Sequence, residues 1–198
     1  KRERGVSECI IEECMILANG CAARFARENN LPFVYRVHDK PEAERVEKLI
    51  LVVTAARPNP VLTDSVTLWM NQAKSGDHTA LMDSNLYRIY SREYYRKNKW
   101  MVPILGRFTK PKSYKRFLIM AQACLDHDCY DALPAIRAET LVLGGEQDKC
   151  LGGEASREIA ARIGGAQLRM YPEWGHGLYE EEKTFNRTVR EFLSRDGC

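Results

Sequence analysis

The feature of this sequence that most constrains its fold is a pair of short, uninterrupted apolar runs, Ile50–Thr54 (ILVVT) and Thr140–Gly144 (TLVLG). Runs of this length without polar alternation are typical of strands that are covered on both faces in a parallel sheet. A third strand is predicted at Leu168–Tyr171, and helical patterns separate the three. Strands that alternate with helices predict an α/β fold with a parallel sheet.

Apolar residues that recur every three or four positions predict the helices. They fall at Ser7–Glu28, near 63–75, 78–97 and 112–126, at Glu154–Ile163 and at Glu180–Leu193, and a short extended segment is predicted at Phe33–Val37. Residues 61 to about 133 are therefore mostly helical. We divide the chain into an N-terminal part, residues 1–45, and a larger part, residues 46–198.

The chain has 198 residues, with 30 Lys and Arg against 27 Asp and Glu, and this near-neutral balance with 44% hydrophobic residues is typical of a globular domain. No apolar run approaches the ~20 residues of a membrane span, and no signal peptide precedes the first helix. The seven cysteines are scattered and include no C-x-x-C pair. We therefore expect a cytoplasmic, reducing location and neither a metal site nor a cofactor.

Two residues with catalytic chemistry follow two of the predicted strands. Asp148 lies just past the second strand, in GGEQDK, and His176 lies just past the third, in EWGHG. The carboxyl ends of parallel strands are where open sheets bind ligands. The carboxylate can fix the imidazole tautomer while the imidazole takes a proton from a nucleophile. The alternative is a capping aspartate and an unrelated loop histidine.

Three segments from about residue 46 onward resemble the C-terminal part of the α/β-hydrolase fold family. They are VEKLILVVTAARPNP, LPAIRAETLVLGGEQDKCLGGEASREIAARI and GAQLRMYPEWGHGLYEEEKTFNRTVREFL. The resemblance implies a partial hydrolase fold, with three C-terminal strands of the sheet and a helical cap at about 61–133. It also implies that Asp148 is the triad acid and His176 the general base.

The sequence departs from that family at the nucleophile. The family carries its serine in a G-x-S-x-G elbow before the strand that Ile50–Thr54 resembles, and this sequence contains no G-x-S-x-G. No nucleophile is identified, although a serine or Cys150 would be the first to test. The resemblance thus implies hydrolysis of an ester or related acyl bond by a triad of which two members are present, and we expect the chain alone to be inactive.

The N-terminal segment resembles a different family. Residues 4–41, RGVSECIIEECMILANGCAARFARENNLPFVYRVHDKP, closely resemble a stretch of the ribonuclease II/ribonuclease R exonucleases. The aspartate cluster that binds magnesium in that family is missing, so we expect no exonuclease activity. Two further interpretations follow: an RNA-binding or 3′–5′ exoribonuclease fragment, and a non-functional composite of two gene fragments joined near Pro41–Leu49.

The partners that the sequence suggests follow from these alternatives. A small ester-like substrate is expected if the missing part of the hydrolase is supplied, and no membrane partner is expected. The stretch Arg88–Arg116 carries ten Lys and Arg residues, one acid and interleaved aromatic residues, a pattern that favours weak binding of single-stranded RNA. The competing interpretation is a helical surface whose aromatic residues pack inward, which the three- and four-residue spacing of the tyrosines favours.

Overall fold

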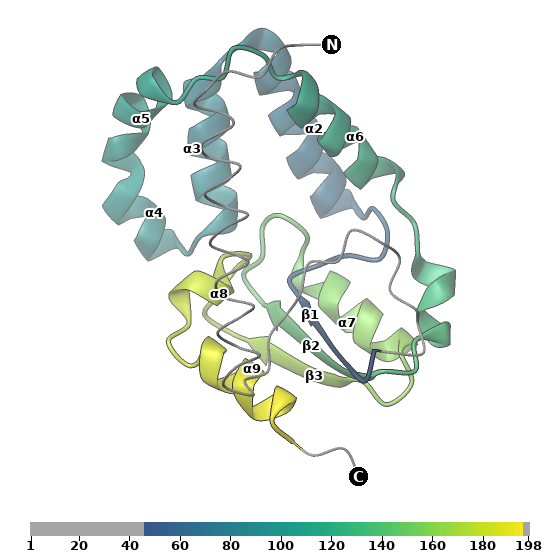
Figure 1. Cartoon of the computed structure of the whole chain (residues 1–198). Coiled ribbons are helices and arrows are strands. Elements are labelled where there is room, and N and C mark those ends of the chain that lie inside the picture. Colours follow the sequence, from purple (N-terminus) through teal and green to yellow (C-terminus); the bar gives the residue numbers. More distant parts are fainter. Residues whose placement is uncertain (1–45, 196–198) are drawn as a thin grey trace, which may run out of the picture. The chain divides into compact units, whose positions relative to one another are not determined.

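A three-stranded parallel sheet forms the centre of the part of the chain that the computed structural model describes, residues 46–195 (Figure 1). Contacts divide the chain into two compact units, one of them Val46–Val189 and the other residues 1–45 with 190–198. The sheet belongs to the first unit. The helix and the extended segment predicted before residue 45 lie outside the described residues.

The strands run in the order β1-β2-β3, and both pairs are parallel. They are β1 (Lys48–Val52), β2 (Glu139–Gly145) and β3 (Gln167–Tyr171). The central strand β2 is buried from Thr140 onward, which explains its unbroken apolar sequence. The three predicted strands are confirmed. The first ends two residues earlier than predicted because Val53 turns out of the strand with φ of 38°.

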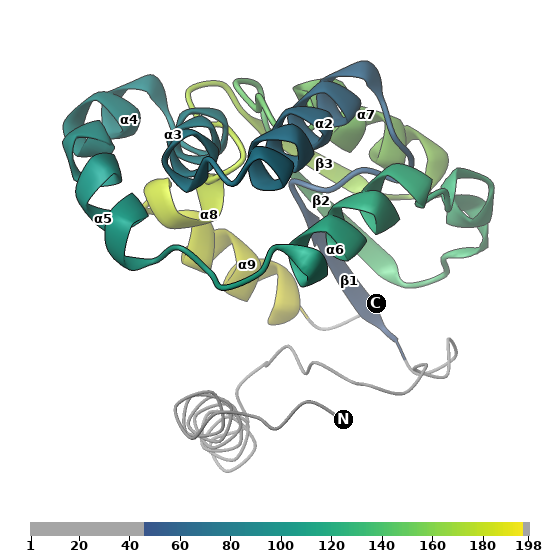
Figure 2. The same ribbon diagram turned by 90° about the horizontal axis from the view of Figure 1, so that it is seen from above.

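Helices fill the connections between the strands. Between β1 and β2 lie α2 (Pro60–Ser75), α3 (His78–Ile89), α4 (Arg92–Asn98), η2 (Lys99–Met101), α5 (Val102–Phe108), α6 (Lys115–Asp126) and η3 (Tyr130–Ala135). The connection from β2 to β3 holds α7 (Gly153–Arg162), and α8 (Leu178–Glu181) and α9 (Phe185–Leu193) follow β3. Figure 2 shows α2 to α6 grouped together.

Local capping chemistry explains where the long helices begin and end. The Asn59 side chain accepts a hydrogen bond from the backbone of Leu62, and Pro60 occupies the first turn of α2. The helix ends at Gly76, whose φ of 72° suits glycine alone without strain. Asp77 then caps α3 by accepting from the backbone of Ala80.

The apolar core has two centres. One lies between the sheet and α7, where Val142 of β2 packs with Ile159 and Ile163 and with Ala56 and Leu133. The second lies within the helices between β1 and β2, α2 to α6, which we call the helical segment. It is built from side chains of α2 and α6. Helix α2 also contacts α3, which in turn contacts α5. The helical segment therefore has a core of its own beside that of the sheet.

Two predicted helices are interrupted in the structure. The helix predicted at 78–97 ends at Ile89, because Ser91 begins a new helix, α4, by accepting a hydrogen bond from the backbone of Tyr94. The helix predicted at Glu180–Leu193 is split in the same way, and Glu182 accepts hydrogen bonds from both the backbone and the hydroxyl of Thr184 at the break. Helix α5 is not predicted at all.

One edge of the sheet ends with β1. Within residues 46–195, β1 pairs with β2 alone, and every one of its residues is half-buried. No helix among the described residues is long and apolar enough to cross a membrane.

Candidate active site

The loop after β2 fixes the carboxylate of Asp148. One carboxylate oxygen, Oδ1, accepts hydrogen bonds from the backbone N–H groups of Cys150 at 2.7 Å and Leu151 at 2.9 Å. The side chain is only 3% exposed. A carboxylate held by two backbone donors cannot rotate freely, so its second oxygen, Oδ2, points in a fixed direction.

The loop after β3 brings His176 to that second oxygen. Nδ1 of His176 lies 3.0 Å from Oδ2 of Asp148. Behind the histidine, the Trp174 indole N–H donates to Glu182 at 2.7 Å, which ties the loop to the segment that follows α8. The hydrogen-bond contact that the sequence predicts between Asp148 and His176 is therefore present, at the carboxyl ends of β2 and β3.

The two loops approach each other more closely than any side chain would permit. A Cβ at Gly145 would lie 2.4 Å from the carbonyl oxygen of Trp174 and 2.5 Å from that of Gly175. The backbone of Gln147 donates to the same Trp174 carbonyl at 3.0 Å. Glycine at position 145 is thus a condition for the contact between the loops. The glycine pair at the end of the second strand is the sequence signal for this approach.

Side chains from the helical segment hold the Asp148 loop from the other side. Asn59, the cap of α2, also donates to the Leu151 carbonyl at 2.7 Å. The fully buried Ser65 hydroxyl donates to the Lys149 carbonyl at 3.0 Å, and Arg88 donates to both that hydroxyl and that carbonyl. These anchors were not predicted from the sequence, because their partners lie 61 to 92 residues away along the chain.

The contact geometry permits proton transfer chemistry at His176. Nδ1 faces a carboxylate, so the favoured neutral tautomer carries its proton on Nδ1 and leaves the Nε2 lone pair free. The buried carboxylate would also stabilise the imidazolium after Nε2 takes up a proton. The His176 side chain is 25% exposed, so a reactant has access to the ring.

Cys150 lies beside the pair. Its thiol is 3% exposed, and burial together with the neighbouring Asp148 carboxylate raises its pKa to about 12. The possible metal-ligating atoms of Asp148, Cys150 and His176 all lie within 4.8 Å of one another. Residues 46–195 contain no other group of three such side chains. These residues could hold a metal ion only if the thiol lost its proton and the Asp148–His176 hydrogen bond were broken.

Two of the described serines, Ser65 and Ser91, are engaged elsewhere. Ser65 is fully buried against Lys149, and Ser91 donates to Glu181 at 2.5 Å. Within residues 46–195, no serine hydroxyl forms a hydrogen bond with His176. A groove of about 730 Å³ runs along the start of α2. Its lining residues are Pro58, Asn59, Pro60, Thr63, Asp64, Thr67, Leu68 and Asn71, and neither Asp148 nor His176 is among them.

Most tyrosines of the basic stretch are occupied by other side chains. Tyr87 and Tyr95 meet edge to face at 5.3 Å, and the Tyr95 hydroxyl donates to Asp83. Tyr90 stacks on Tyr94 at 4.3 Å. Burial and a hydrogen bond to Glu180 also raise the pKa of Tyr90. Tyr90 and Tyr95 are half-buried, but Tyr87 and Tyr94 are 46% and 37% exposed, so the expectation that the aromatic residues pack inward is met only in part.

Family models match two parts of the chain. The model of the RNB domain matches residues 1–116, and the model described as TAP-like protein matches residues 126–197. Residues 46–116, which include β1 and the helices up to the start of α6, therefore lie within the RNB match. That match extends well beyond residues 4–41, which carry the ribonuclease resemblance in the sequence.

Curated relatives fall into the same two groups. Ribonuclease R 1 of Lactococcus lactis subsp. lactis is 42% identical over 50 residues, which are 25% of this chain and 6% of that protein. The 2-hydroxy-6-oxo-6-phenylhexa-2,4-dienoate hydrolase of Delftia acidovorans is 32% identical over 87 residues, which are 42% of this chain and 30% of that protein. The chain thus spans a small part of each relative.

Solved structures with a similar fold are α/β hydrolases and related enzymes. An α/β-hydrolase enzyme from a Medee basin deep-sea metagenome library superimposes with a TM-score of 0.72 at 23% identity, over 80% of this chain and 60% of that one. The enol-lactonase of Burkholderia xenovorans LB400 gives a TM-score of 0.64 at 23% identity, over 78% and 59%. The described residues therefore have the α/β-hydrolase fold, as the sequence predicts.

Proposed function

The chain belongs to the RNB domain family, and its described residues have the α/β-hydrolase fold; we propose that these residues supply the acid–base pair of a hydrolase for an ester or related acyl bond. His176 is the general base and Asp148 the acid that orients it. The observation that carries the proposal is the 3.0 Å contact between His176 Nδ1 and the fixed Asp148 carboxylate at the ends of two parallel strands.

The reaction that this pair supports begins with proton transfer to His176. Nε2 takes the proton of a nucleophile as that nucleophile attacks the acyl carbon, and Asp148 stabilises the resulting imidazolium. His176 then donates the proton to the leaving group. The helices between β1 and β2 act as the cap, supported by the hydrogen bonds of Asn59, Ser65 and Arg88 to the Asp148 loop.

The nucleophile comes from outside this sequence in our proposal. The sequence has no G-x-S-x-G elbow, and no serine within residues 46–195 forms a hydrogen bond with His176. Loss of the nucleophile alone costs a factor of about 10⁶ in turnover. The chain by itself should therefore show almost no hydrolysis.

Turnover of p-nitrophenyl acetate by the purified chain tests this proposal. His176→Ala removes the base, and His127→Ala, at an exposed position, is the matched control. We expect all three proteins to hydrolyse the ester at the same slow rate. Rapid turnover that is lost in His176→Ala alone would mean that the chain contains its own nucleophile. Rapid turnover that survives in His176→Ala would overturn the role of the base.

RNA binding is the second candidate function, and the RNB domain match over residues 1–116 favours it. Salt-dependent binding of a single-stranded RNA, measured by fluorescence anisotropy, tests it. An exonuclease is not proposed, because the sequence lacks the carboxylate cluster on which metal-dependent phosphodiester cleavage depends.

The third interpretation is a composite of two gene fragments without activity, and a gene sequence tests it rather than a measurement on the protein. The genomic sequence across codons 40–50 shows whether the two resemblances are continuous in one gene.

The free thiols of Cys124, Cys129 and Cys150 support the proposal of a reducing compartment, because oxidising compartments select for paired cysteines.

A further inference from the structure

An exposed apolar stripe lies on the helical segment, far along the chain from Asp148 and His176. Trp100, Ile104 and Phe108 are 65%, 52% and 79% exposed, and we call these three residues the apolar stripe. Scattered exposed apolar residues are ordinary, but several large ones gathered on one short segment mark an interaction surface. Leu105, which is 40% exposed, widens the stripe.

The packing of α5 explains why the stripe points outward. Val102 and Gly106 are buried, and a Cβ at Gly106 would lie 2.8 Å from the Thr79 hydroxyl oxygen, so α5 rests tightly on α3 through this face. Ile104 and Phe108 are each two residues further along the helix, which is about 200° around its axis. The stripe is thus the face opposite to the one that packs, and α5 cannot rotate to hide it.

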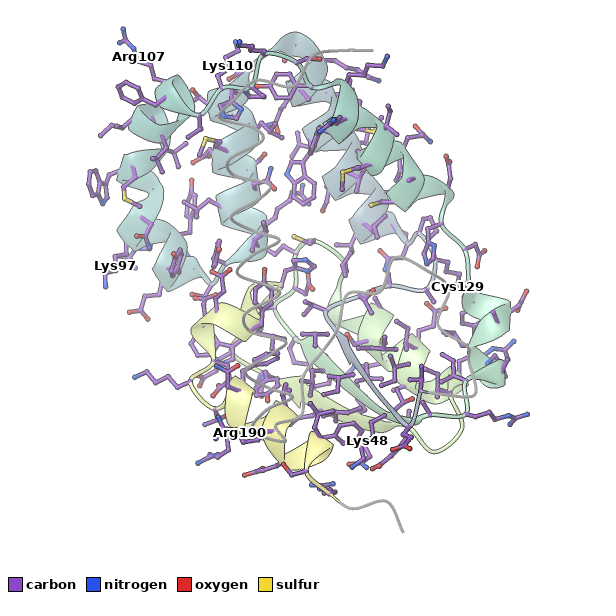
Figure 3. The ribbon with its side chains drawn as sticks, viewed as in Figure 1. Lys48, Lys97, Arg107, Lys110, Cys129 and Arg190 are labelled. Atoms are coloured by element: carbon purple, nitrogen blue, oxygen red, sulfur yellow. The ribbon has the colours of Figure 1, made fainter. Side chains whose placement is uncertain are left out.

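Positive charge is concentrated on α4, the helix that precedes the stripe along the chain. Arg92, Arg96 and Lys97 line a hollow of about 600 Å³ on α4, together with the single acid Glu93. None of these three cations forms an ion pair with another residue in the range 46–195. Figure 3 shows Lys97 and Arg107 pointing away from α4 and α5 on the outer side of these helices.

We propose that α4, η2 and α5 form a surface that binds peripherally to anionic phospholipid membranes. The apolar stripe enters the boundary between headgroups and acyl chains, and the hollow of Arg92, Arg96 and Lys97 receives a lipid phosphate. This inference does not depend on the proposed hydrolase chemistry. It revises the expectation of no membrane partner, which depended on the absence of a spanning segment.

The composition of the stripe favours a lipid surface over RNA. Single-stranded nucleic acid needs a series of exposed aromatic faces on which successive bases stack. Here Tyr90 and Tyr94 stack on each other, and the aliphatic side chains Ile104 and Leu105 separate Trp100 from Phe108. Aliphatic and aromatic residues beside Lys and Arg are instead the composition of interfacial segments.

Sedimentation with vesicles tests the proposal on the full chain. Vesicles of phosphatidylcholine alone are compared with vesicles that also contain phosphatidylglycerol, at low and high salt. We expect binding to the anionic vesicles alone, weakened by salt. Substitution of Arg96→Gln with Lys97→Gln should lower the vesicle affinity about 30-fold, at about 1 kcal/mol for each charge near the surface.

The stripe itself is tested by Trp100→Ser with Phe108→Ser, which should weaken vesicle binding at least about tenfold. Ile119→Ser with Met120→Ser is the matched control, because these α6 side chains are also highly exposed, at 61% and 70%, but belong to another helix. Thermal unfolding by circular dichroism verifies that each variant is folded.

Three results would overturn the proposal. One is equal binding of the wild-type chain to neutral and anionic vesicles, or no binding to either. Another is a chain that binds single-stranded RNA but not vesicles, with the RNA affinity lowered by Arg96→Gln with Lys97→Gln. The last is a dimer in light scattering that Trp100→Ser with Phe108→Ser converts to monomer, because the stripe would then be an interface between two copies.

Discussion

A single methyl group at position 145 should separate the two loops that carry Asp148 and His176. The Cβ of Gly145→Ala would lie 2.4 and 2.5 Å from two backbone carbonyl oxygens, those of Trp174 and Gly175, where ordinary contact begins at 3.4 Å. Backbone atoms cannot rotate aside as a side chain end can. The loop after β3 must therefore move by about 1 Å.

That displacement is large enough to break the contact between the loops. The His176–Asp148 distance of 3.0 Å would lengthen beyond hydrogen-bond range, and so would the 3.0 Å bond from Gln147 to the Trp174 carbonyl. Overpacking costs about 1–3 kcal/mol, and each lost hydrogen bond costs about 1 kcal/mol more. We expect Gly145→Ala to lower the free energy of unfolding by about 3–5 kcal/mol.

Urea unfolding followed by circular dichroism measures this effect. Gly164→Ala is the matched control, because a Cβ at Gly164 would meet nothing within 4 Å and its φ lies outside the left-handed region. The control should change the free energy of unfolding by less than about 0.5 kcal/mol. If Gly145→Ala proved as stable as Gly164→Ala, the close approach of the loops described above would be wrong.

Hydrogen bonds from Thr184 are the main cause of the lowered pKa of Glu182. The stability gained from that carboxylate is present above the pKa of the unfolded state and is lost as the pH falls through the lower pKa of the folded state. Glu182→Gln should therefore lower the free energy of unfolding by about 1 kcal/mol at neutral pH and by almost nothing well below about pH 4. Urea titrations at the two pH values measure the difference. The Cys150 thiol, with its pKa raised to about 12, should resist iodoacetamide at pH 8 in the folded chain while the exposed Cys124 reacts, as peptide mass spectrometry would reveal; equal labelling would refute its burial. Arg88→Met should lower the free energy of unfolding by about 1–2 kcal/mol, because it removes donors from buried acceptors, whereas Arg116→Met at an exposed position should have no measurable effect.

The sheet could be predicted because its strands carry their own signal. Burial on both faces requires continuous apolar residues, so Thr140–Gly144 identifies the central strand without any knowledge of its neighbours. The order of the strands and helices then places Asp148 and His176 at one edge. This part of the candidate site followed from position along the chain alone.

The remaining features depend on contacts that local patterns do not contain. The break before α4 occurs where Glu181, from the far end of the chain, accepts hydrogen bonds from both the backbone and the hydroxyl of Ser91. Periodicity continues through that point, so the sequence predicts one long helix. Likewise, Ser65 and Arg88 resemble ordinary helix residues until the fold brings them to the Lys149 carbonyl.

The contact with Asp148 should fix the tautomer of the neutral His176 ring so that Nε2 carries the free lone pair, and nuclear magnetic resonance measures that tautomer. Long-range proton–nitrogen correlation spectra of the full chain distinguish the two tautomers, and His176→Ala assigns the signal among the four histidines. We expect the Nδ1–H tautomer in the neutral ring, and a changed pattern in Asp148→Asn. An Nε2–H tautomer in the wild-type chain, or a His176 signal that Asp148→Asn leaves unchanged, would contradict it.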